Sequence, residues 1–341
     1  MIKEAIAKLA DRQDMTEKEA ETAMTEVMLG DSTPAQIGAF LMALRMKGET
    51  VAEVIGCARS MRVAALKVVT HRAPLVDTCG TGGDGVGTFN ISTTVALVVA
   101  GSGVAVAKHG NRSVSSSSGS ADLLESLGVK IDLGPEAVGK CIDEVGMGFL
   151  FAPRFHPAMK HAVAPRREMG VRTVFNILGP LTNPASASVQ LIGVYSPYLT
   201  ELMARVLAGL GTSRAMVVHG ASGIDELSVT GPNWVTRLDG DRVKTFSIDP
   251  HHLGLAMATL NDLKGGTAED NARITLGLLK GGSGVRRDIV LLNAAAALVC
   301  VGQARDFSEG LAMAAESIDS GRASKVLQDL VRFTQGTESP E

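Results

Sequence analysis

The 341-residue chain contains few aromatic residues and carries no excess of positive charge. It has 9 Phe, 2 Tyr and 1 Trp, and its formal net charge is −3. Nucleic-acid binding depends on a strong basic field, and so does electrostatic attachment to an anionic membrane surface. A platform of stacked aromatic rings is equally unsupported. We therefore expect neither nucleic acid nor a membrane as a partner.

Long hydrophobic runs and closely spaced cysteines are also missing. The longest apolar stretches, Val95–Ala107 and Ile289–Gly302, are shorter than the roughly 18 residues that a membrane span needs. The N-terminal segment has the charges of an amphipathic helix and not the pattern of a signal peptide. The cysteines form no C-x-x-C pair and favour reduced thiols over disulfides or zinc ligands: Cys57, Cys79, Cys141 and Cys300. These absences predict a soluble, cytoplasmic protein of enzyme size.

The first 65 residues have the pattern of helices only. Three segments begin with a threonine followed three residues later by Glu or Gln, which is the capping-box pattern of a helix start: Thr16–Glu19, Thr33–Gln36 and Thr50–Glu53. Gly30 and Gly48 stand where such helices should end. We expect a small bundle without catalytic residues. Its methionines should lie in the core or in a contact between subunits: Met24, Met28, Met42, Met46 and Met61.

From about residue 74 short apolar strands alternate with helix-like segments. The expected strands are Pro74–Thr78, Val104–Lys108, Val129–Asp132, Gly148–Ala152, Val189–Ser196 and Ala215–Gly220. Because these strands are apolar throughout, the alternation predicts an α/β fold with a mostly parallel sheet covered by helices on both faces. Trp234–Ile248, with Asp239-Gly240 at its centre, predicts a hairpin followed by helices. Arg166–Pro184 fits no regular pattern.

Glycine, in contrast, is abundant: its 38 residues are about 11% of the 341-residue chain, against a usual share of about 7%. Three of them, Gly80, Gly82 and Gly85, satisfy G-x-G-x-x-G directly after an expected strand. A dinucleotide-binding loop would need a helix that starts at the third glycine and an acid about 20 residues later. Neither is present, and no G-K-[ST] sequence occurs. The sequence therefore argues against a Rossmann or P-loop nucleotide site.

Residues 85–121 contain no Asp or Glu. This window has eight Ser, three Thr and six Gly, together with Lys108, His109 and Arg112. Hydroxyls, free backbone amides and cations without carboxylates are what a phosphate or diphosphate cradle requires. Asn90-Ile-Ser-Thr would stand at a helix N-terminus, and Lys108-His-Gly-Asn-Arg112 would follow the next strand. The alternative is a serine-rich surface loop, and the two loops on consecutive strands favour the anion site.

Two further polar clusters stand out. Asp225-Glu226 follows an apolar strand and is either a solvated loop pair or a set of oxygen ligands for Mg²⁺, with Asp84 as a third acid. The run from Arg154 to Arg172 is rich in Arg and His but has no H-E-x-x-H zinc motif. We interpret Lys160, Arg167 and Arg172 as a solvated helix face. One guanidinium of the run could meet a substrate carboxylate.

Six ordered motifs together resemble the anthranilate phosphoribosyltransferase family, and the similarity spans almost the whole chain. They are Gly80-Thr-Gly-Gly-Asp84, Asn90-Ile-Ser-Thr93, Lys108-His-Gly-Asn-Arg112 with Gly119-Ser-Ala-Asp122, His156-Pro-Ala-Met159, Arg172-Thr-Val-Phe-Asn176 with Gly179-Pro-Leu-Thr-Asn-Pro184, and Asp225-Glu-Leu-Ser228. The resemblance implies a nucleoside-phosphorylase-like fold. It also implies a helical domain, residues 1–71 with 168–190, and an α/β domain, residues 72–167 with 191–341. The active site would lie in the cleft between them, and homodimers would pair through the helical domains.

The resemblance also implies individual roles. The residues that would bind phosphoribosyl diphosphate (PRPP) are Gly80, Gly83, Asp84, Thr88, Asn90, Ile91, Ser92, Thr93, Lys108, His109, Gly110, Asn111, Arg112, Ser113, Val114, Ser115, Ser116 and Ser120. Those that match the magnesium positions are Ser92, Asp225 and Glu226. Those that match the anthranilate positions are Gly80, Asn111 and Arg166, with Arg166 at the carboxylate. Ser117 departs from the family pattern, since many members have Lys or Arg there.

The implied reaction is attack of the anthranilate amine on ribose C1 with loss of diphosphate, assisted by Mg²⁺. Three other functions fit the sequence less well. A pyrimidine nucleoside phosphorylase of the same fold would be longer and have a further C-terminal domain. A nucleic-acid-binding protein that kept the fold should have a basic face, which the net charge of −3 argues against. A purely structural role would leave the acid-free window unexplained.

Overall fold

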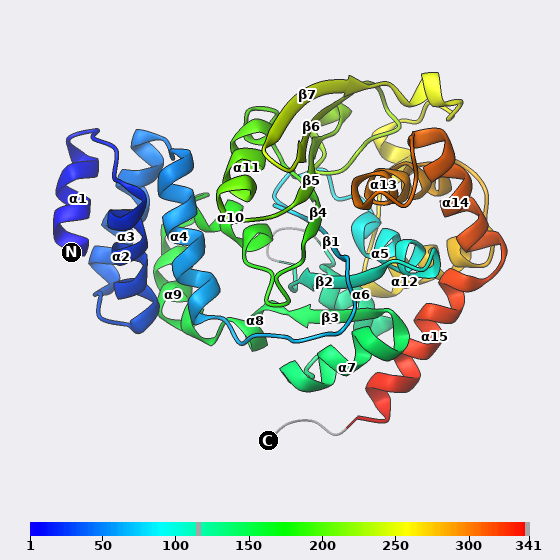
Figure 1. Ribbon diagram of the computed structural model, residues 1–341, viewed down its shortest axis with the longest axis horizontal. Coiled ribbons are helices and arrows are strands. Elements are labelled where there is room, and N and C mark those ends of the chain that lie inside the picture. Colours follow the sequence, from blue (N-terminus) through cyan, green and yellow to red (C-terminus); the bar gives the residue numbers. More distant parts are fainter. Residues whose placement is uncertain (114–116, 338–341) are drawn as a thin grey trace.

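The computed structural model describes residues 1–113 and 117–337, which form two lobes. Figure 1 shows a helical lobe on the left and, on the right, a larger lobe built around one sheet. The bundle consists of α1 (Ile2–Ala10), α2 (Glu17–Leu29), α3 (Pro34–Lys47) and α4 (Val51–Ala64). The helical N-terminal lobe and the α/β lobe confirm the predicted fold class.

The capping signals of the helical lobe are confirmed. Each of the three threonine hydroxyls accepts a hydrogen bond from the backbone N–H three residues on, and each Glu or Gln side-chain oxygen accepts one from the threonine N–H. Gly30, with φ 81°, ends α2 in the left-handed region, and Gly48, with φ 93°, follows α3. Met24, Met28 and Met61 are buried, whereas Met42 and Met46 on α3 are exposed. The methionines thus divide between core and surface.

The chain returns to the helical lobe after the third strand. Helix α9 (Lys160–Met169) packs on α2 and α3, and the short helix α10 (Phe175–Leu178) packs on α4. The stretch that fits no sequence pattern contains the end of α9, the left-handed Gly170 that follows it, and α10. Contact with the bundle already begins at Pro157–Met159, which packs on α2, whereas the resemblance implies a return at residue 168. Strand β4 already includes residues 189 and 190, which the sequence analysis assigned to the helical domain.

The sheet has seven strands in the order β3-β2-β1-β4-β5-β6-β7. The first five run parallel, and β6 and β7 form the predicted antiparallel hairpin around Gly240. The strand bounds are β1 Leu75–Gly80, β2 Ala105–Gly110, β3 Met147–Phe151, β4 Val189–Gly193, β5 Arg214–His219, β6 Asn233–Asp239 and β7 Arg242–Ile248. Between them run α5 (Ile91–Gly101), α6 (Ser120–Ser126), α7 (Pro135–Val145), α8 (Ala152–Phe155) and α11 (Tyr198–Gly209). The chain ends in α12 (Ala268–Leu279), α13 (Val285–Val301), α14 (Phe307–Asp319) and α15 (Arg322–Gln335).

The strand expected at Val129–Asp132 is wrong. Its apolar side chains are buried, but the segment does not join the sheet. The N–H of Lys130 instead donates to Thr334 Oγ1 near the end of α15, at 3.2 Å. A side chain from the C-terminal helix, 204 residues away, takes the hydrogen bond that a strand partner would have supplied.

Alternate residues of the strands face two different cores. On β5, Met216 and Val218 pack with α5, α13, α14 and α15 on one face. Ala215 and Val217 pack on the other face with α11 and with the helices of the N-terminal bundle. The helical lobe therefore shares one continuous hydrophobic core with a face of the sheet. Among the described residues no helix combines the length and hydrophobicity needed to cross a bilayer.

Strand β1 lies at the centre of the parallel part, between β2 and β4. The chain leaves β1 toward β2 on one side, whereas β4 continues to β5 on the other. Connections that diverge in this way leave a crevice at the carboxyl ends of the two strands, which is where open α/β sheets bind ligands. Gly80 and Gly193 are paired across this point.

Candidate active site

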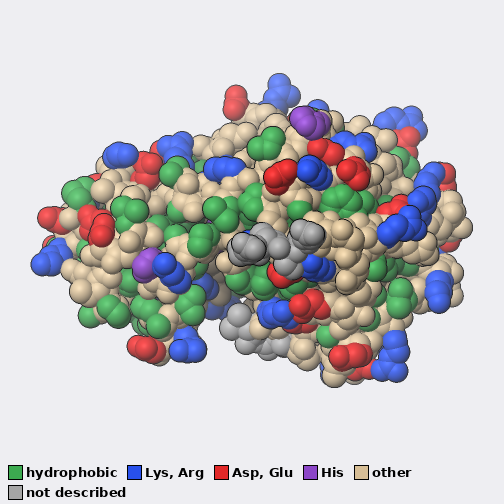
Figure 2. Space-filling model, turned by 90° about the horizontal axis from the view of Figure 1, so that it is seen from below, with side chains coloured by type: hydrophobic (Ala, Val, Ile, Leu, Met, Phe, Trp, Pro, Cys, Tyr) green, Lys and Arg blue, Asp and Glu red, His purple; other side chains and the backbone are tan. Residues whose placement is uncertain are grey.

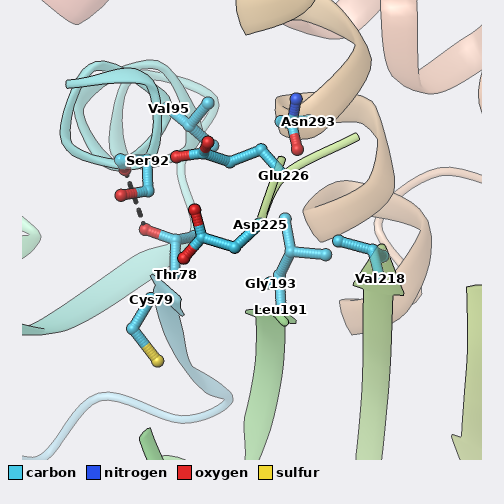
Figure 3. Close-up of a pocket in the computed structure, with 10 residues that line it drawn as sticks. All are labelled: Thr78, Cys79, Ser92, Val95, Leu191, Gly193, Val218, Asp225, Glu226 and Asn293. Atoms are coloured by element: carbon cyan, nitrogen blue, oxygen red, sulfur yellow. Dashed lines mark hydrogen bonds between the residues drawn. The ribbon is translucent and has the colours of Figure 1, made fainter. Parts of the chain in front are cut away.

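The segment that carries Asp225 and Glu226 crosses the crevice between β1 and β4. A Cβ atom built on Gly193 would lie 1.4 Å from the carbonyl oxygen of Asp225, and one built on Gly80 would lie 2.3 Å from Asp225 Oδ2. Glycine at 193 is therefore required for the backbone of the acidic segment to pass so close, and glycine at 80 leaves room for the Asp225 carboxylate. Figure 3 shows the two carboxylate side chains extending toward Ser92 and the start of α5.

Asp225 is buried and Glu226 half-buried, and the protein neutralises the pair poorly. The N–H of Gly82 donates to Asp225 Oδ2 at 2.7 Å. Burial, reinforced by the charge of Asp84, raises the pKa of Asp225 to about 6. Burial and the charges of Asp225 and Asp84 raise the pKa of Glu226 well above its usual range. Within the described chain, Glu226 Oε2 is buried without a hydrogen-bond partner. Such a site favours a cation.

Lys108 supplies one positive charge to this buried cluster. Its ammonium group donates to the carbonyl oxygen of Thr78 at 2.5 Å and lies 3.5 Å from Ser92 Oγ. Burial lowers the pKa of Lys108, and the nearby carboxylates, Asp77 foremost, act in the opposite direction. Asp77 is itself fixed by the Asn183 amide at 2.7 Å and by the His109 N–H at 3.1 Å.

The predicted cradle residues 90–93 stand at the N-terminus of α5. Asn90 is the N-cap residue, and the N–H groups of the first helical turn have no partner within the helix. The Asn90 carboxamide donates to the Ser118 carbonyl at 3.0 Å and accepts from the Asn271 amide of α12 at 2.9 Å. Thr88 pairs with Lys264 in a short antiparallel bridge. The two halves of the acid-free window are thus brought together, as predicted.

The second half of the window follows β2. A Cβ atom on Gly110 would lie 2.5 Å from Ser120 Oγ, so the chain passes close to the start of α6 there. Arg112 forms ion pairs with Asp122 and Glu125 of α6. The N–H of Arg112 donates to the side-chain oxygen of Asn111 at 2.7 Å. Val114, Ser115 and Ser116, three of the predicted PRPP contacts, lie outside the described residues.

His109 forms a buried pair with His156, and their Nε2 atoms are 3.2 Å apart. Burial, with a smaller contribution from His156, lowers the pKa of His109 to about 3. Burial and the charge of Lys67 lower the pKa of His156 to about 4. Both rings are therefore neutral at physiological pH and connect β2 to the segment that leads into α9.

Two arginines of the basic run face different environments. The guanidinium of Arg166, on α9, lies 4.9 Å from the centre of the Phe175 ring, and burial lowers its pKa. No ion pair with Arg166 occurs among the described residues. Arg172 is not on a helix, contrary to the interpretation as a helix face. It stacks 4.3 Å from the Tyr195 ring and donates to the carbonyl oxygen of Gly83 in the glycine-rich loop, while Arg45 of α3 donates to the Arg172 carbonyl.

The chain matches two family models over nearly its full length. Residues 3–65 match the helical bundle domain of a glycosyl transferase family, and residues 72–324 match the α/β domain of a glycosyl transferase family. It is 57% identical to the anthranilate phosphoribosyltransferase of Moorella thermoacetica, over 98% of this chain and 99% of that protein. The enzyme of the same name from Symbiobacterium thermophilum is 56% identical, over 98% of both chains.

The chain belongs to the anthranilate phosphoribosyltransferase family. It is therefore an enzyme of the glycosyltransferase class, and the family resemblance is confirmed. Among solved structures, anthranilate phosphoribosyltransferase from Thermus thermophilus is 46% identical, with a TM-score of 0.93 over 97% of this chain and 99% of that one. The Saccharomyces cerevisiae enzyme in complex with PRPP and Mg is 28% identical, with a TM-score of 0.90 over 98% of both chains.

Several residues that organise the site of this family member were not assigned a role from the sequence. Asp122 Oδ2 accepts the N–H groups of Ser113 at 3.1 Å and Gly119 at 2.8 Å, which ties together the ends of the loop they bound. Asn293 contacts the segment that carries the acid pair. Its signal in the sequence is a single amide in the apolar run of α13. Arg172 has no comparable signal outside the family motif.

Proposed function

We propose that the chain catalyses Mg²⁺-dependent transfer of the phosphoribosyl group from PRPP to the amino group of anthranilate. The products would be N-(5-phosphoribosyl)anthranilate and diphosphate, a step of tryptophan biosynthesis. The observation that carries this proposal is the meeting of an acid-free set of hydroxyls and amides with a buried acid pair at one sheet edge. The S. cerevisiae structure with PRPP and Mg adds support, because that protein has the same fold.

The proposed PRPP contacts come from three elements. The loop after β1 contributes Gly80, Gly83, Asp84 and Thr88, and the start of α5 contributes Asn90, Ile91, Ser92 and Thr93. The end of β2 and the segment that follows contribute Lys108, His109, Gly110, Asn111, Arg112, Ser113 and Ser120, and we keep the undescribed Val114, Ser115 and Ser116 in the set. Arg112 would exchange its contact with Glu125 for one with phosphate, because its ion pairs are at the surface and weak.

The residues proposed for magnesium fit that ion chemically. Asp225 and Glu226 provide hard carboxylate oxygens, one of them buried without a partner, and Ser92 provides a hydroxyl. No group of three His, Cys, Asp or Glu side chains among the described residues is arranged to hold a metal. Mg²⁺ commonly binds through one or two carboxylates together with substrate phosphates and water. When bound, it would neutralise charge on the departing diphosphate.

Positioning would supply most of the remaining rate acceleration. The amine of anthranilate is neutral and weakly nucleophilic, and the diphosphate is already a good leaving group. Gly80, Asn111 and Arg166 are the proposed anthranilate contacts, with the guanidinium of Arg166 at the carboxylate. The cradle amides and Lys108 would hold the diphosphate while positive charge develops on the sugar. This reaction does not require a strong general base.

The test is loss of anthranilate fluorescence when PRPP and Mg²⁺ are added to the purified chain. We expect the loss to require all three components, and the product mixture to contain diphosphate. Unchanged fluorescence with folded protein would contradict the proposal. Phosphorolysis of pyrimidine nucleosides, measured in parallel with inorganic phosphate, is expected to be absent. Its presence would instead support the nucleoside phosphorylase alternative.

We also propose a homodimer that pairs through the helical lobe, and a cytoplasmic location. Met42 and Met46 of α3 are 37% and 66% exposed, which supports an apolar contact there. Figure 2 shows hydrophobic side chains on the surface of this lobe, at the left. The four cysteines, all within the described residues, are unpaired thiols, which is usual in a reducing compartment. Sedimentation of the wild type and of Met46→Glu tests the dimer, since a buried charge should dissociate it.

A further inference from the structure

The acidic segment 225–228 belongs to neither a helix nor a strand, yet Asp225, Leu227 and Ser228 are buried and Glu226 is half-buried. Gly220 approaches it closely, since a Cβ atom there would lie 2.1 Å from the carbonyl oxygen of Glu226. Gly193 does the same at the carbonyl of Asp225. These two glycines allow the segment to lie where it does. They provide no hydrogen bonds to its side chains, so other groups must fix its orientation.

Two asparagine side chains bind the main chain directly after the acids. Asn293 Oδ1 accepts the N–H of Leu227 at 2.9 Å, and its Nδ2 donates to the Leu227 carbonyl at 2.8 Å. Asn233 repeats this arrangement one residue later, accepting the Ser228 N–H at 2.6 Å and donating to the Ser228 carbonyl at 3.0 Å. Each carboxamide thus makes, with one residue of the segment, the two main-chain hydrogen bonds that a neighbouring strand would otherwise make.

Asn293 is anchored on rigid structure. It is 2% exposed in the middle of α13, and its amide also donates to the Ile289 carbonyl one turn earlier, at 2.8 Å. Figure 3 shows it on α13, beside the segment that carries Asp225 and Glu226. It lines a cavity of about 10 Å³, which it shares with both acids and Ser92. The acidic segment therefore satisfies the oxygen of this carboxamide and one of its N–H groups, and α13 itself satisfies the other.

We propose that Asn293, assisted by Asn233, is a positioning residue for the metal-binding carboxylates. By fixing both hydrogen-bonding groups of Leu227, it sets the direction in which the preceding Glu226 and Asp225 leave the backbone toward Ser92. The inference rests on the proposed role of the acid pair in Mg²⁺ binding. Asn293 is not one of the proposed substrate or metal contacts, and it would act through the backbone between α13 and the acids.

The decisive variant is Asn293→Leu, which keeps the branched shape of the side chain but removes both hydrogen bonds to Leu227. We expect Mn²⁺, bound in the presence of PRPP and followed by electron paramagnetic resonance, to bind about 10- to 100-fold more weakly. The Mg²⁺ concentration for half-maximal rate should rise by a similar factor. The anthranilate KM at saturating Mg²⁺ should stay within about twofold, because its proposed contacts are on other elements.

Ser317→Ala is the matched control. Ser317 is a buried polar residue on α14 that donates one hydrogen bond to the Val98 carbonyl at 2.8 Å, away from the acids. We expect it to lower the melting temperature without changing Mn²⁺ affinity. If Asn293→Leu does not fold, Asn293→Ala replaces it, since its smaller side chain leaves room for water to reach Leu227. Normal Mn²⁺ affinity in the folded Asn293 variant would overturn the proposal.

The double variant Asp225→Asn with Glu226→Gln tests the acid pair as the metal site separately from the positioning role of Asn293. We expect it to abolish tight Mn²⁺ binding and to remove most of the Mg²⁺ dependence of the rate. A normal metal response in this variant would refute the acid pair as the metal site, and with it the role of Asn293. Loss of metal binding in the double variant, together with normal binding in the Asn293 variant, would refute the positioning role alone.

Discussion

The environment of the Arg166 side chain suits the binding of an anionic ligand group. Its guanidinium rests on the Phe175 ring, and burial disfavours its charged form without an ion pair among the described residues to compensate. Its neighbour Arg167 is exposed to solvent. The two residues are adjacent in sequence and differ mainly in this environment, so they form a natural pair for mutagenesis.

We predict that Arg166→Ala raises the anthranilate KM by about 10- to 100-fold, since a charge-assisted hydrogen bond is worth about 1.5–3 kcal/mol. The PRPP KM should change much less. Steady-state kinetics with each substrate varied in turn measures both constants, and Arg167→Ala serves as the control. An unchanged anthranilate KM would show that another group meets the carboxylate.

The buried histidine pair gives a pH-dependent prediction. His156 has a folded pKa of about 4, against 6.5 for an exposed imidazole. Between these values the unfolded chain binds a proton that the folded chain cannot, so the free energy of unfolding decreases as pH falls from about 6.5 toward 4. The share from His156 is at most about 1.4 kcal/mol per pH unit.

We therefore expect His156→Gln to show a shallower loss of stability on acidification than the wild type. Denaturant unfolding at pH 7, 6 and 5 measures the difference. The exposed His252→Gln should keep the wild-type slope. Equal slopes in all three proteins would mean that His156 takes up a proton as easily when folded as when unfolded.

Among the elements, the glycine-rich loop after β1 is linked to the helical lobe through one arginine. Arg172 donates to Gly83, and its own carbonyl accepts from Arg45 of α3. Because the N–H and C=O of a trans peptide point in opposite directions, fixing the Gly83 carbonyl also fixes the Asp84 N–H. Through Arg172, a shift of α3 would therefore change the orientation of the Asp84 N–H, which belongs to the loop proposed to bind diphosphate.

We predict that Arg172→Ala raises the PRPP KM by about 5- to 10-fold, because the lost hydrogen bond is charge-assisted but partly exposed. Arg172→Lys should not restore it, since an ammonium cannot both stack on Tyr195 and reach Gly83. Kinetics at saturating anthranilate measures the effect, with the surface variant Arg205→Ala as the control. A wild-type PRPP KM in Arg172→Ala would exclude a role in orienting the loop.

Helices and strands differed in how far local sequence determined them. The capping boxes at Thr16, Thr33 and Thr50 could be predicted because donor and acceptor are three residues apart. The stretch Val129–Asp132 could not, because its apolar pattern suits a strand but its hydrogen bond goes to Thr334. In the site, the acid-free window and the acid pair were visible in the sequence. The hydrogen bonds from Asn233 and Asn293 to the main chain after the acid pair could not be predicted. They join residues 5 and 66 positions apart and produce no periodic pattern in the sequence.

At the scale of the whole molecule, the two lobes are not independent folding units. The core that contains Cys57 of α4 continues through α11 to the sheet residues Ala215 and Val217. The opposite core contains Cys141 of α7. Separating the lobes would expose the apolar face of α11 and of the sheet, which is a large hydrophobic cost.

We accordingly predict a single unfolding transition in which Cys57 and Cys141 become reactive together. Pulse labelling of thiols along a denaturant series, followed by mass spectrometry, reports on each cysteine separately. Leu207→Ala in α11 should move both midpoints by the same amount, with a loss of about 2–5 kcal/mol. Earlier exposure of Cys57 would show instead that the helical lobe melts by itself.

The placement of β1 between β2 and β4 has a consequence for biosynthesis. While the protein is being made, β2 is available soon after β1, but β4 ends 113 residues after Gly80. At synthesis rates of about 5–20 residues per second, one edge of the central strand stays unpaired for roughly 6 to 23 seconds. The nascent chain exposes a row of free backbone groups during that interval. Ribosome-bound chaperones that shield strand edges should therefore matter most for this enzyme between residues 80 and 193.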